Sequence, residues 1–114
     1  CSDKDDTYYD LLSENLDILK SSVDQDNNPL KIVEVEMSKK RFIPGDDEPS
    51  SYINFYIANS AIILPFFGDD VADQNAMKII KEQFPNRQIE CLNGHDILMG
   101  GGNIHCITMN VPKI

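Results

Sequence analysis

The chain has 114 residues, enough for one domain with a modest hydrophobic core. Hydrophobic residues make up 41% and charged residues 25%, as in ordinary globular proteins, and no apolar run is long enough to span a bilayer. The formal net charge of -9 disfavours nucleic acid as a partner, because phosphates would be repelled. The same charge would weakly attract a small cation, although solubility is its simpler explanation.

The cysteines bear on the redox compartment. Cys1, Cys91 and Cys106 are an odd number, which argues against a complete disulfide framework. Free thiols are typical of a reducing compartment, so we expect a cytoplasmic protein. The N-terminal stretch is acidic and no apolar segment follows it, which predicts no signal peptide. Because the chain does not start with Met, we also expect that it was cut from a longer polypeptide.

The first half of the chain predicts a helix, a strand and a loop. Thr7 is a suitable N-cap, with Asp10 at the capping-box position. Polar residues 24–29 stop the helix, and residues 31–37 alternate in part, which favours a strand. The polar segment 38–50 carries prolines and a glycine and predicts a loop, either a surface excursion or a functional lid. The apolar residues at helical spacing are Tyr8, Leu12, Leu16, Leu19 and Val23.

A hairpin is predicted in the middle of the chain. Segments 52–58 and 61–67 are both rich in strand-forming residues, and Asn59 and Ser60 between them favour a tight turn. The second segment is apolar throughout, as expected when both faces of a strand are covered.

A helix and a returning strand follow the hairpin. Asp70 is the expected N-cap, Pro85 ends the helix, and 87–92 is the expected strand. After the glycines, 103–108 is again expected to be extended. The residues expected on the buried side of the helix are Val71, Ala76, Met77, Ile79, Ile80 and Phe84.

These elements predict an α/β fold built on a ββαβ unit. The helix and strand before residue 38 weakly repeat the helix and strand of the second half, as in a repeated supersecondary unit. We therefore expect residues 1–50 to hold the end of one module and a loop, and 51–114 to form the last module. Because a partial module cannot bury its own face, further modules of the same polypeptide are expected beside it.

The run from Gly100 to Cys106 is the strongest candidate site. Three consecutive glycines most simply form a flexible turn, but here they lead directly to a thiol. Slim, permissive backbone at Gly100, Gly101 and Gly102 would let a flat ligand approach the sulfur, so these glycines are candidate substrate-binding residues. Cys106 is the candidate nucleophile, which requires a thiolate and a base or positive environment to form it.

The histidines offer no convincing base. His105 adjoins Cys106, but neighbouring side chains of an extended segment point to opposite faces, so we expect the His105 ring beyond hydrogen-bond reach of the sulfur. His95 is interpreted first as a turn residue, with a catalytic role as the lesser alternative. Without a base, the pKa of Cys106 is expected near the ordinary thiol value of about 8.5. Cys91 is interpreted as a buried strand thiol.

The sequence predicts neither a metal site nor a cofactor. Its histidines and cysteines show no paired spacing such as C-x-x-C or H-x-x-x-H. The glycine run does not match the phosphate-binding loops G-x-G-x-x-G and G-x-x-x-x-G-K, and no G-x-S-x-G elbow is present.

Segment 100–108 resembles the C-terminal signature of the agmatine deiminases and bacterial-type peptidylarginine deiminases. Weaker similarity covers essentially the whole chain, at 14–16, 28–30, 51–59 and 84–87. The resemblance implies a pentein fold, in which five ββαβ modules surround a substrate channel. It also implies that the Cys106 thiolate attacks a guanidinium carbon, that ammonia leaves, and that water hydrolyses the covalent thiouronium.

The resemblance further implies partners and alternatives. The substrate would be a small cationic guanidine: agmatine, converted to N-carbamoylputrescine, or an arginine side chain of a protein. The catalytic histidine and guanidinium-binding acids would lie in upstream modules outside this chain. A third interpretation is a truncated module without activity, and a homo-oligomer is compatible with all three. Residues 109–111 depart from the glutamine-rich stretch of the family, which leaves the branch open.

Overall fold

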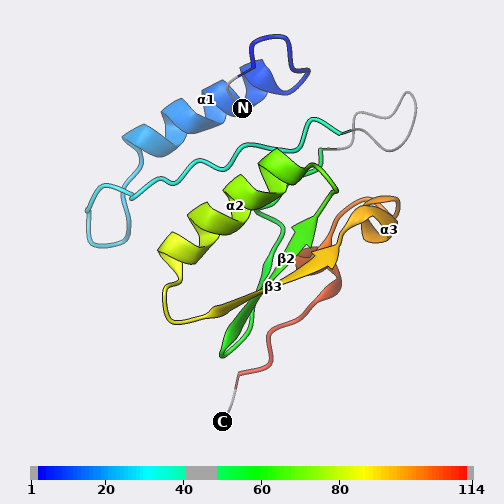
Figure 1. The fold of residues 1–114 in the computed structure, drawn as a ribbon. Helices are drawn as coiled ribbons and strands as arrows, with labels where there is room; N and C mark the ends of the chain where they lie inside the picture. The colour runs from blue at the N-terminus through cyan, green and yellow to red at the C-terminus, as the bar shows by residue number, and fades with distance from the viewer. Residues whose placement is uncertain (1–2, 41–48, 113–114) are drawn as a thin grey trace. The chain divides into compact units, whose positions relative to one another are not determined.

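The computed structural model describes residues 3–40 and 49–112, so most of the predicted loop 38–50 lies outside the described residues. The chain divides into two compact units, Cys1–Glu36 and Met37–Ile114, and each is described by itself (Figure 1). Among the described residues, no helix combines the length and the apolar character needed to cross a membrane.

The first unit is a helix followed by a turn and an extended segment. Helix α1 spans Tyr9–Ser21, and no side chain caps its N-terminus, so the prediction of Thr7 as N-cap was wrong. None of its residues is fully buried. The predicted strand over 31–37 was also wrong: the backbone there is extended, but the only pairing recorded near it in the described residues is an isolated bridge between Val23 and Pro29. Alternation predicts extended backbone, whereas a strand also needs a neighbour for its N–H and C=O groups.

The second unit contains the predicted ββαβ arrangement. Strand β1 (Tyr56–Ile57) pairs antiparallel with β2 (Ala61–Phe66), and β2 pairs parallel with β3 (Gln88–Asn93). Asn59 and Ser60 form the predicted tight turn, which the Ala58 N–H closes by donating to the Ala61 carbonyl at 2.9 Å. Strand β1 is much shorter than the predicted 52–58, because the residues before it are held by side-chain contacts instead of a strand partner.

Helix α2 spans Asp70–Gln83 and lies over one face of the sheet (Figure 1). Its N-cap is Asp69, whose carboxylate accepts a hydrogen bond from the Ala72 N–H at 3.3 Å, one residue earlier than predicted. The helix ends at Gln83 with Phe84 as its C-cap, directly before Pro85, as predicted. Its buried positions are Asp73, Ala76 and Ile80. The prediction that Val71 is buried was wrong, since its side chain is 82% exposed.

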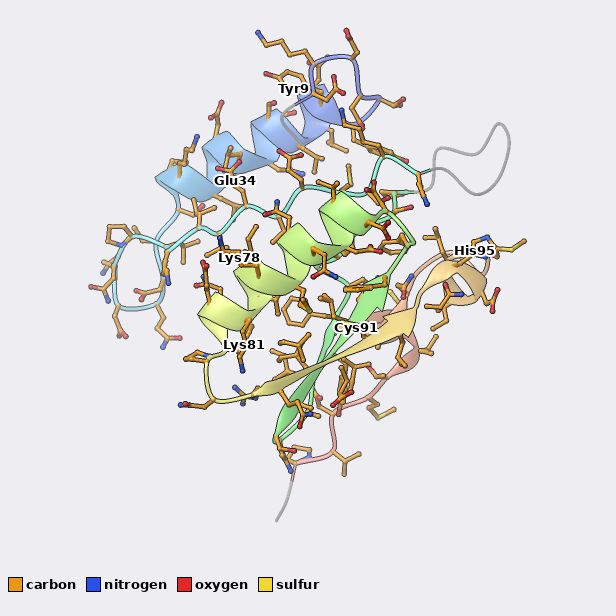
Figure 2. All side chains as sticks on the ribbon, in the orientation of Figure 1. Tyr9, Glu34, Lys78, Lys81, Cys91 and His95 are labelled. Atoms are coloured by element: carbon orange, nitrogen blue, oxygen red, sulfur yellow. The ribbon has the colours of Figure 1, made fainter. Side chains whose placement is uncertain are left out.

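The core of this unit forms between α2 and the sheet, where the side chains of both meet (Figure 2). Ile62 and Leu64 of β2 are completely buried. Beside them the Asp73 carboxylate is 3% exposed and accepts two hydrogen bonds, from the Tyr52 hydroxyl at 2.6 Å and from the Phe67 N–H at 3.0 Å. Burial and the neighbouring Asp73 charge raise the pKa of Tyr52, which therefore stays a donor.

Replacing Tyr52 by Phe is expected to lower the free energy of unfolding by about 1.5–3 kcal/mol, because the buried Asp73 carboxylate loses one of its donors. Urea denaturation measures the change. The control is Tyr56→Phe, since the Tyr56 hydroxyl makes no hydrogen bond among the described residues, and this variant should stay within about 0.5 kcal/mol of wild type. Equal stability of the two variants would contradict the role given to Tyr52.

Candidate functional site

Cys106 lies on a short 3-10 helix, Ile104–Ile107, and the prediction of an extended segment over 103–108 was wrong. Asn103 is the N-cap, and its side-chain oxygen accepts a hydrogen bond from the Ile104 N–H at 3.0 Å. Its carbonyl accepts a hydrogen bond from the Cys106 N–H at 2.9 Å, which closes the turn. One turn of this kind has too few residues to show an apolar period, so the sequence pattern did not reveal it.

Because His105 and Cys106 lie on a 3-10 helix, the reason given for placing their side chains on opposite faces does not hold. Successive side chains of a 3-10 helix are about 120° apart, so they do not alternate between opposite faces. The expectation about contact nevertheless agrees with the structure: no hydrogen bond joins the His105 ring to Cys106 in the described part of the chain. His105 instead donates its backbone N–H to the Asn54 carbonyl at 3.2 Å.

Asn54 is the residue that sequence reasoning missed. Its side-chain amide donates to the Cys106 sulfur at 3.0 Å, and its side-chain oxygen lies 3.3 Å from the Cys106 N–H as an acceptor. With the backbone bond to His105, Asn54 therefore makes three contacts to the short helix. The only signal in the sequence was a polar residue within the apolar segment 52–58. Alternation on a half-exposed strand explains such a residue without a site.

The thiol of Cys106 is exposed and is more acidic than expected. The backbone amide of Asn103 and then the side-chain amide of Asn54 lower the pKa of Cys106 below its ordinary value, because both stabilise the thiolate. The expectation of an ordinary pKa considered only a charged base, but neutral N–H donors act in the same direction. No carboxylate or imidazole takes part in this shift.

The glycine run differs from residue to residue. Gly102 has φ +152°, and a Cβ there would lie 3.0 Å from both the Cβ and the sulfur of Cys106, so the approach of the thiol requires glycine. Gly101 has φ +80° with open space around its Cα. Gly100 continues the preceding turn by donating to the Ile97 carbonyl at 2.9 Å. The three glycines thus form a turn, which was their simplest interpretation from the sequence. Gly102 also leaves room for the sulfur of Cys106.

Cys91 and His95 lie at a different place in this unit. Both line a cleft of about 570 Å³ at the ends of β2 and β3, and Cys106 is not among the residues that line it. Burial, followed by the charges of Asp73 and Glu90, raises the pKa of Cys91, as expected for a half-buried strand thiol. Its environment therefore opposes the thiolate that a nucleophile needs.

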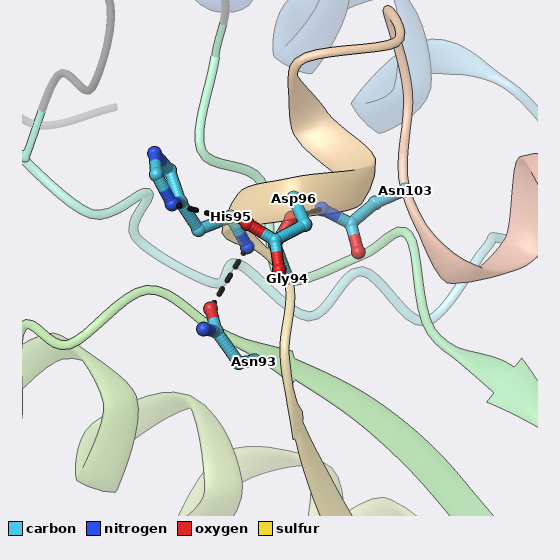
Figure 3. A network of polar contacts seen from close by, with 5 residues as sticks. All are labelled: Asn93, Gly94, His95, Asp96 and Asn103. Carbon is cyan, nitrogen blue, oxygen red and sulfur yellow. Dashed lines mark hydrogen bonds and ion pairs between the residues drawn. The ribbon is translucent and has the colours of Figure 1, made fainter.

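His95 begins the short helix α3 (His95–Leu98). Its N–H donates to the Asn93 side chain at 3.0 Å, and its ring nitrogen lies 3.6 Å from the Asp96 carboxylate (Figure 3). These contacts are local and agree with the interpretation of His95 as a turn residue. Within residues 3–40 and 49–112, no three histidine, cysteine or acidic side chains cluster as metal ligands would.

Replacing Asn54 by Ala should raise the pKa of Cys106, because the sulfur loses a side-chain donor. A higher pKa lowers the thiolate fraction at pH 7. The higher intrinsic nucleophilicity of a more basic thiolate offsets part of this, so alkylation by iodoacetamide should slow about threefold. The rate at Cys106 can be followed by peptide mass spectrometry between pH 6 and 10.

The control for this variant is Asn110→Ala, since Asn110 is exposed and makes no hydrogen bond to the thiol. Its alkylation profile should overlay that of wild type. If Asn54→Ala also overlays wild type, the amide of Asn54 does not tune the sulfur.

Comparison with known proteins gives one consistent family. The family model for Porphyromonas-type peptidyl-arginine deiminases matches residues 1–112. Among curated proteins, the putative agmatine deiminase of Legionella pneumophila (strain Paris) is 40% identical over 111 residues, which cover 97% of this chain and 32% of that protein. That of Mycoplasma capricolum is 37% identical over 127 residues, covering 96% and 35%. The chain thus spans about a third of the length of these relatives.

Solved structures agree with the sequence comparison. The putative arginine deiminase from Porphyromonas gingivalis superposes with a TM-score of 0.92 at 27% identity, over 98% of this chain and 33% of that one. The agmatine deiminase of Enterococcus faecalis gives a TM-score of 0.82 at 29% identity, over 99% and 35%. The expected fold, an α/β chain that forms part of a pentein, is confirmed.

Proposed function

Because this chain belongs to the Porphyromonas-type peptidyl-arginine deiminase family, we propose that it is a C-terminal segment of a guanidine deiminase. Such an enzyme is a hydrolase that acts on the C–N bonds of amidines, and Cys106 is its nucleophile. The observation that carries the proposal is the exposed thiol of Cys106, whose pKa two amide donors lower. Agmatine is the proposed substrate, since proteins 37–40% identical to this chain bear the name putative agmatine deiminase.

The chemistry follows from a thiolate and a guanidinium. The Cys106 sulfur forms a bond to the guanidinium carbon, and one C–N bond breaks after its nitrogen is protonated, so that ammonia leaves. The remaining covalent thiouronium is attacked by water, which loses a proton to a general base, and the sulfur leaves again as a thiolate. Agmatine and water thus give N-carbamoylputrescine and ammonia.

The described residues supply the nucleophile and its support. Asn54 contacts the sulfur and the backbone of Cys106, which fixes the direction of attack. Gly102 leaves the sulfur uncovered on its own side, and the open space at Gly101 suits a flat guanidinium. In this proposal Gly100 only sets the turn, while Gly101 and Gly102 lie beside the substrate.

The remaining groups come from upstream modules of the longer polypeptide, in this proposal. Deimination needs a proton donor for ammonia and carboxylates opposite the guanidinium, and neither contacts the thiol in the described residues. Ile107 and Met109, close to the nucleophile in sequence, are 69% and 82% exposed. Large apolar side chains so near a reactive thiol fit a surface that neighbouring modules cover. The cytoplasm is the proposed location, because free thiols are typical of a reducing compartment.

A protein-arginine deiminase is the second candidate, favoured by the description of the matching family. The substrate would then be an arginine side chain in a peptide, and citrulline the product. The chemistry at Cys106 is identical in both cases, so only the assay of both substrates separates them. A non-catalytic module is the third alternative, and a start codon directly before Cys1 would support it.

In the full-length enzyme, Cys106→Ala should abolish turnover, by about a thousandfold or more, because no covalent intermediate can form. Ammonia release from agmatine and from a peptidyl-arginine substrate measures it. Cys91→Ala is the matched control and should keep most of the activity, since Cys91 lines a different cleft and its pKa is raised. Undiminished activity of Cys106→Ala would refute the assignment of the nucleophile.

The 114-residue chain by itself should not deiminate either substrate. It holds the thiol, but no proton donor or guanidinium-binding carboxylate contacts that thiol in the described residues. The ammonia-release assay on the purified chain tests this, with the intact enzyme at the same molar concentration as positive control. Turnover by the chain that depends on Cys106 would show that upstream modules are dispensable.

A further inference from the structure

We infer that Asn103 is a positioning residue that locks the Cys106 segment onto the end of strand β3 through a buried hydrogen bond to Gly94. The inference rests on the proposed function of Cys106 as nucleophile, and it assigns to Asn103 the task of holding that nucleophile in place. Asn103 does not act on the substrate in this scheme. Its side chain connects the sheet to the short helix that carries the thiol.

The first contact of Asn103 is its side-chain hydrogen bond to Gly94, called the tether below. Asn103 is 2% exposed, and its side-chain nitrogen donates to the Gly94 carbonyl at 3.0 Å (Figure 3). Gly94 in turn donates its N–H to the carbonyl of Phe66, the last residue of β2, at 2.8 Å. The chain of contacts therefore runs from the central strand through Gly94 to Asn103. A buried bond of this kind is costly to break, because both partners would stay without water.

The second part is the cap. The side-chain oxygen of Asn103 accepts the Ile104 N–H, and the carbonyl of the same residue accepts the Cys106 N–H. Asparagine thus uses both ends of one amide, the nitrogen on the sheet side and the oxygen on the helix side. Serine can cap, and so can aspartate, but neither has a nitrogen to donate to Gly94. The tether is the contact that specifically requires asparagine.

Gly94 is shaped for this contact. Its φ of -86° and ψ of -6° are open to any residue, so backbone strain does not explain a glycine here. A Cβ at this position would lie 2.9 Å from the side-chain nitrogen of Asn103, 3.0 Å from its oxygen, and 2.9 Å from the Pro65 Cβ. The glycine therefore allows the close approach of both the Asn103 amide and the Pro65 side chain.

The lock acts on the thiol through the backbone of Asn103. The backbone amide of Asn103 is the donor that contributes most to the lowered pKa of Cys106. If the tether is cut, this amide moves relative to the sulfur and the thiol should lose part of its acidity. A merely structural role would change stability without changing the titration of Cys106.

The experiment compares Asn103→Ser, which keeps the cap and loses the tether, with Gly94→Ala, which crowds it. The readout is the pH dependence of Cys106 alkylation by iodoacetamide, resolved by peptide mass spectrometry on protein shown to be folded by circular dichroism. Each variant should react about threefold more slowly at pH 7, the net of a tenfold smaller thiolate fraction and a more nucleophilic thiolate. The double variant should be no slower than either single variant, since both remove the same contact.

The control is Asn93→Ala, which removes a side-chain hydrogen bond to the backbone at the same strand end without contacting residue 103. It should lower the melting temperature while leaving the alkylation profile unchanged. Wild-type titration of Asn103→Ser and Gly94→Ala would overturn the inference, as would additive effects in the double variant. Alkylation does not require turnover, so absence of deimination in the intact enzyme would count against the proposed function alone.

Discussion

The buried carboxylate of Asp73 is the contact on which the geometry of this unit depends. It lies on the first turn of α2 and accepts hydrogen bonds from the Tyr52 hydroxyl and the Phe67 N–H, so it joins the helix, the end of β2 and the segment before the hairpin. Asn54 lies in that segment, two residues after Tyr52. A buried charge is tolerated only when hydrogen-bond donors surround it. Here the two donors belong to the segment before the hairpin and to the end of β2, so the same hydrogen bonds fix both segments to α2.

The candidate nucleophile is held by amides on two sides. Asn54 reaches it from the segment before β1, and Asn103 precedes it on its own short helix. Neutral N–H groups stabilise a thiolate without transferring a proton to it, which leaves the proton transfers of the proposed deimination to other groups. This division fits the proposal of a catalytic centre in which this segment presents an acidic thiol and other modules bring acid, base and charge.

The second unit also exposes large apolar side chains. The second unit buries one face of its sheet under α2, yet Ile53, Leu92 and Met109 stay more than half exposed. The chain also spans about a third of the length of its curated relatives. Exposed apolar side chains of this kind fit the proposal that further modules of the same polypeptide pack beside this one.

Local propensity and a contiguous motif were enough to predict helices α1 and α2 near their observed ends, the turn at Asn59 and Ser60, the ββαβ order and the family. The sequence by itself also identified Cys106 as the candidate nucleophile. Three features came from the folded chain alone: segment 31–37 pairs with no strand among the described residues, 103–108 contains a 3-10 helix, and Asn54 meets a sulfur 52 positions away. Those features depend on groups distant along the chain, whose meeting leaves no period or spacing in the local sequence.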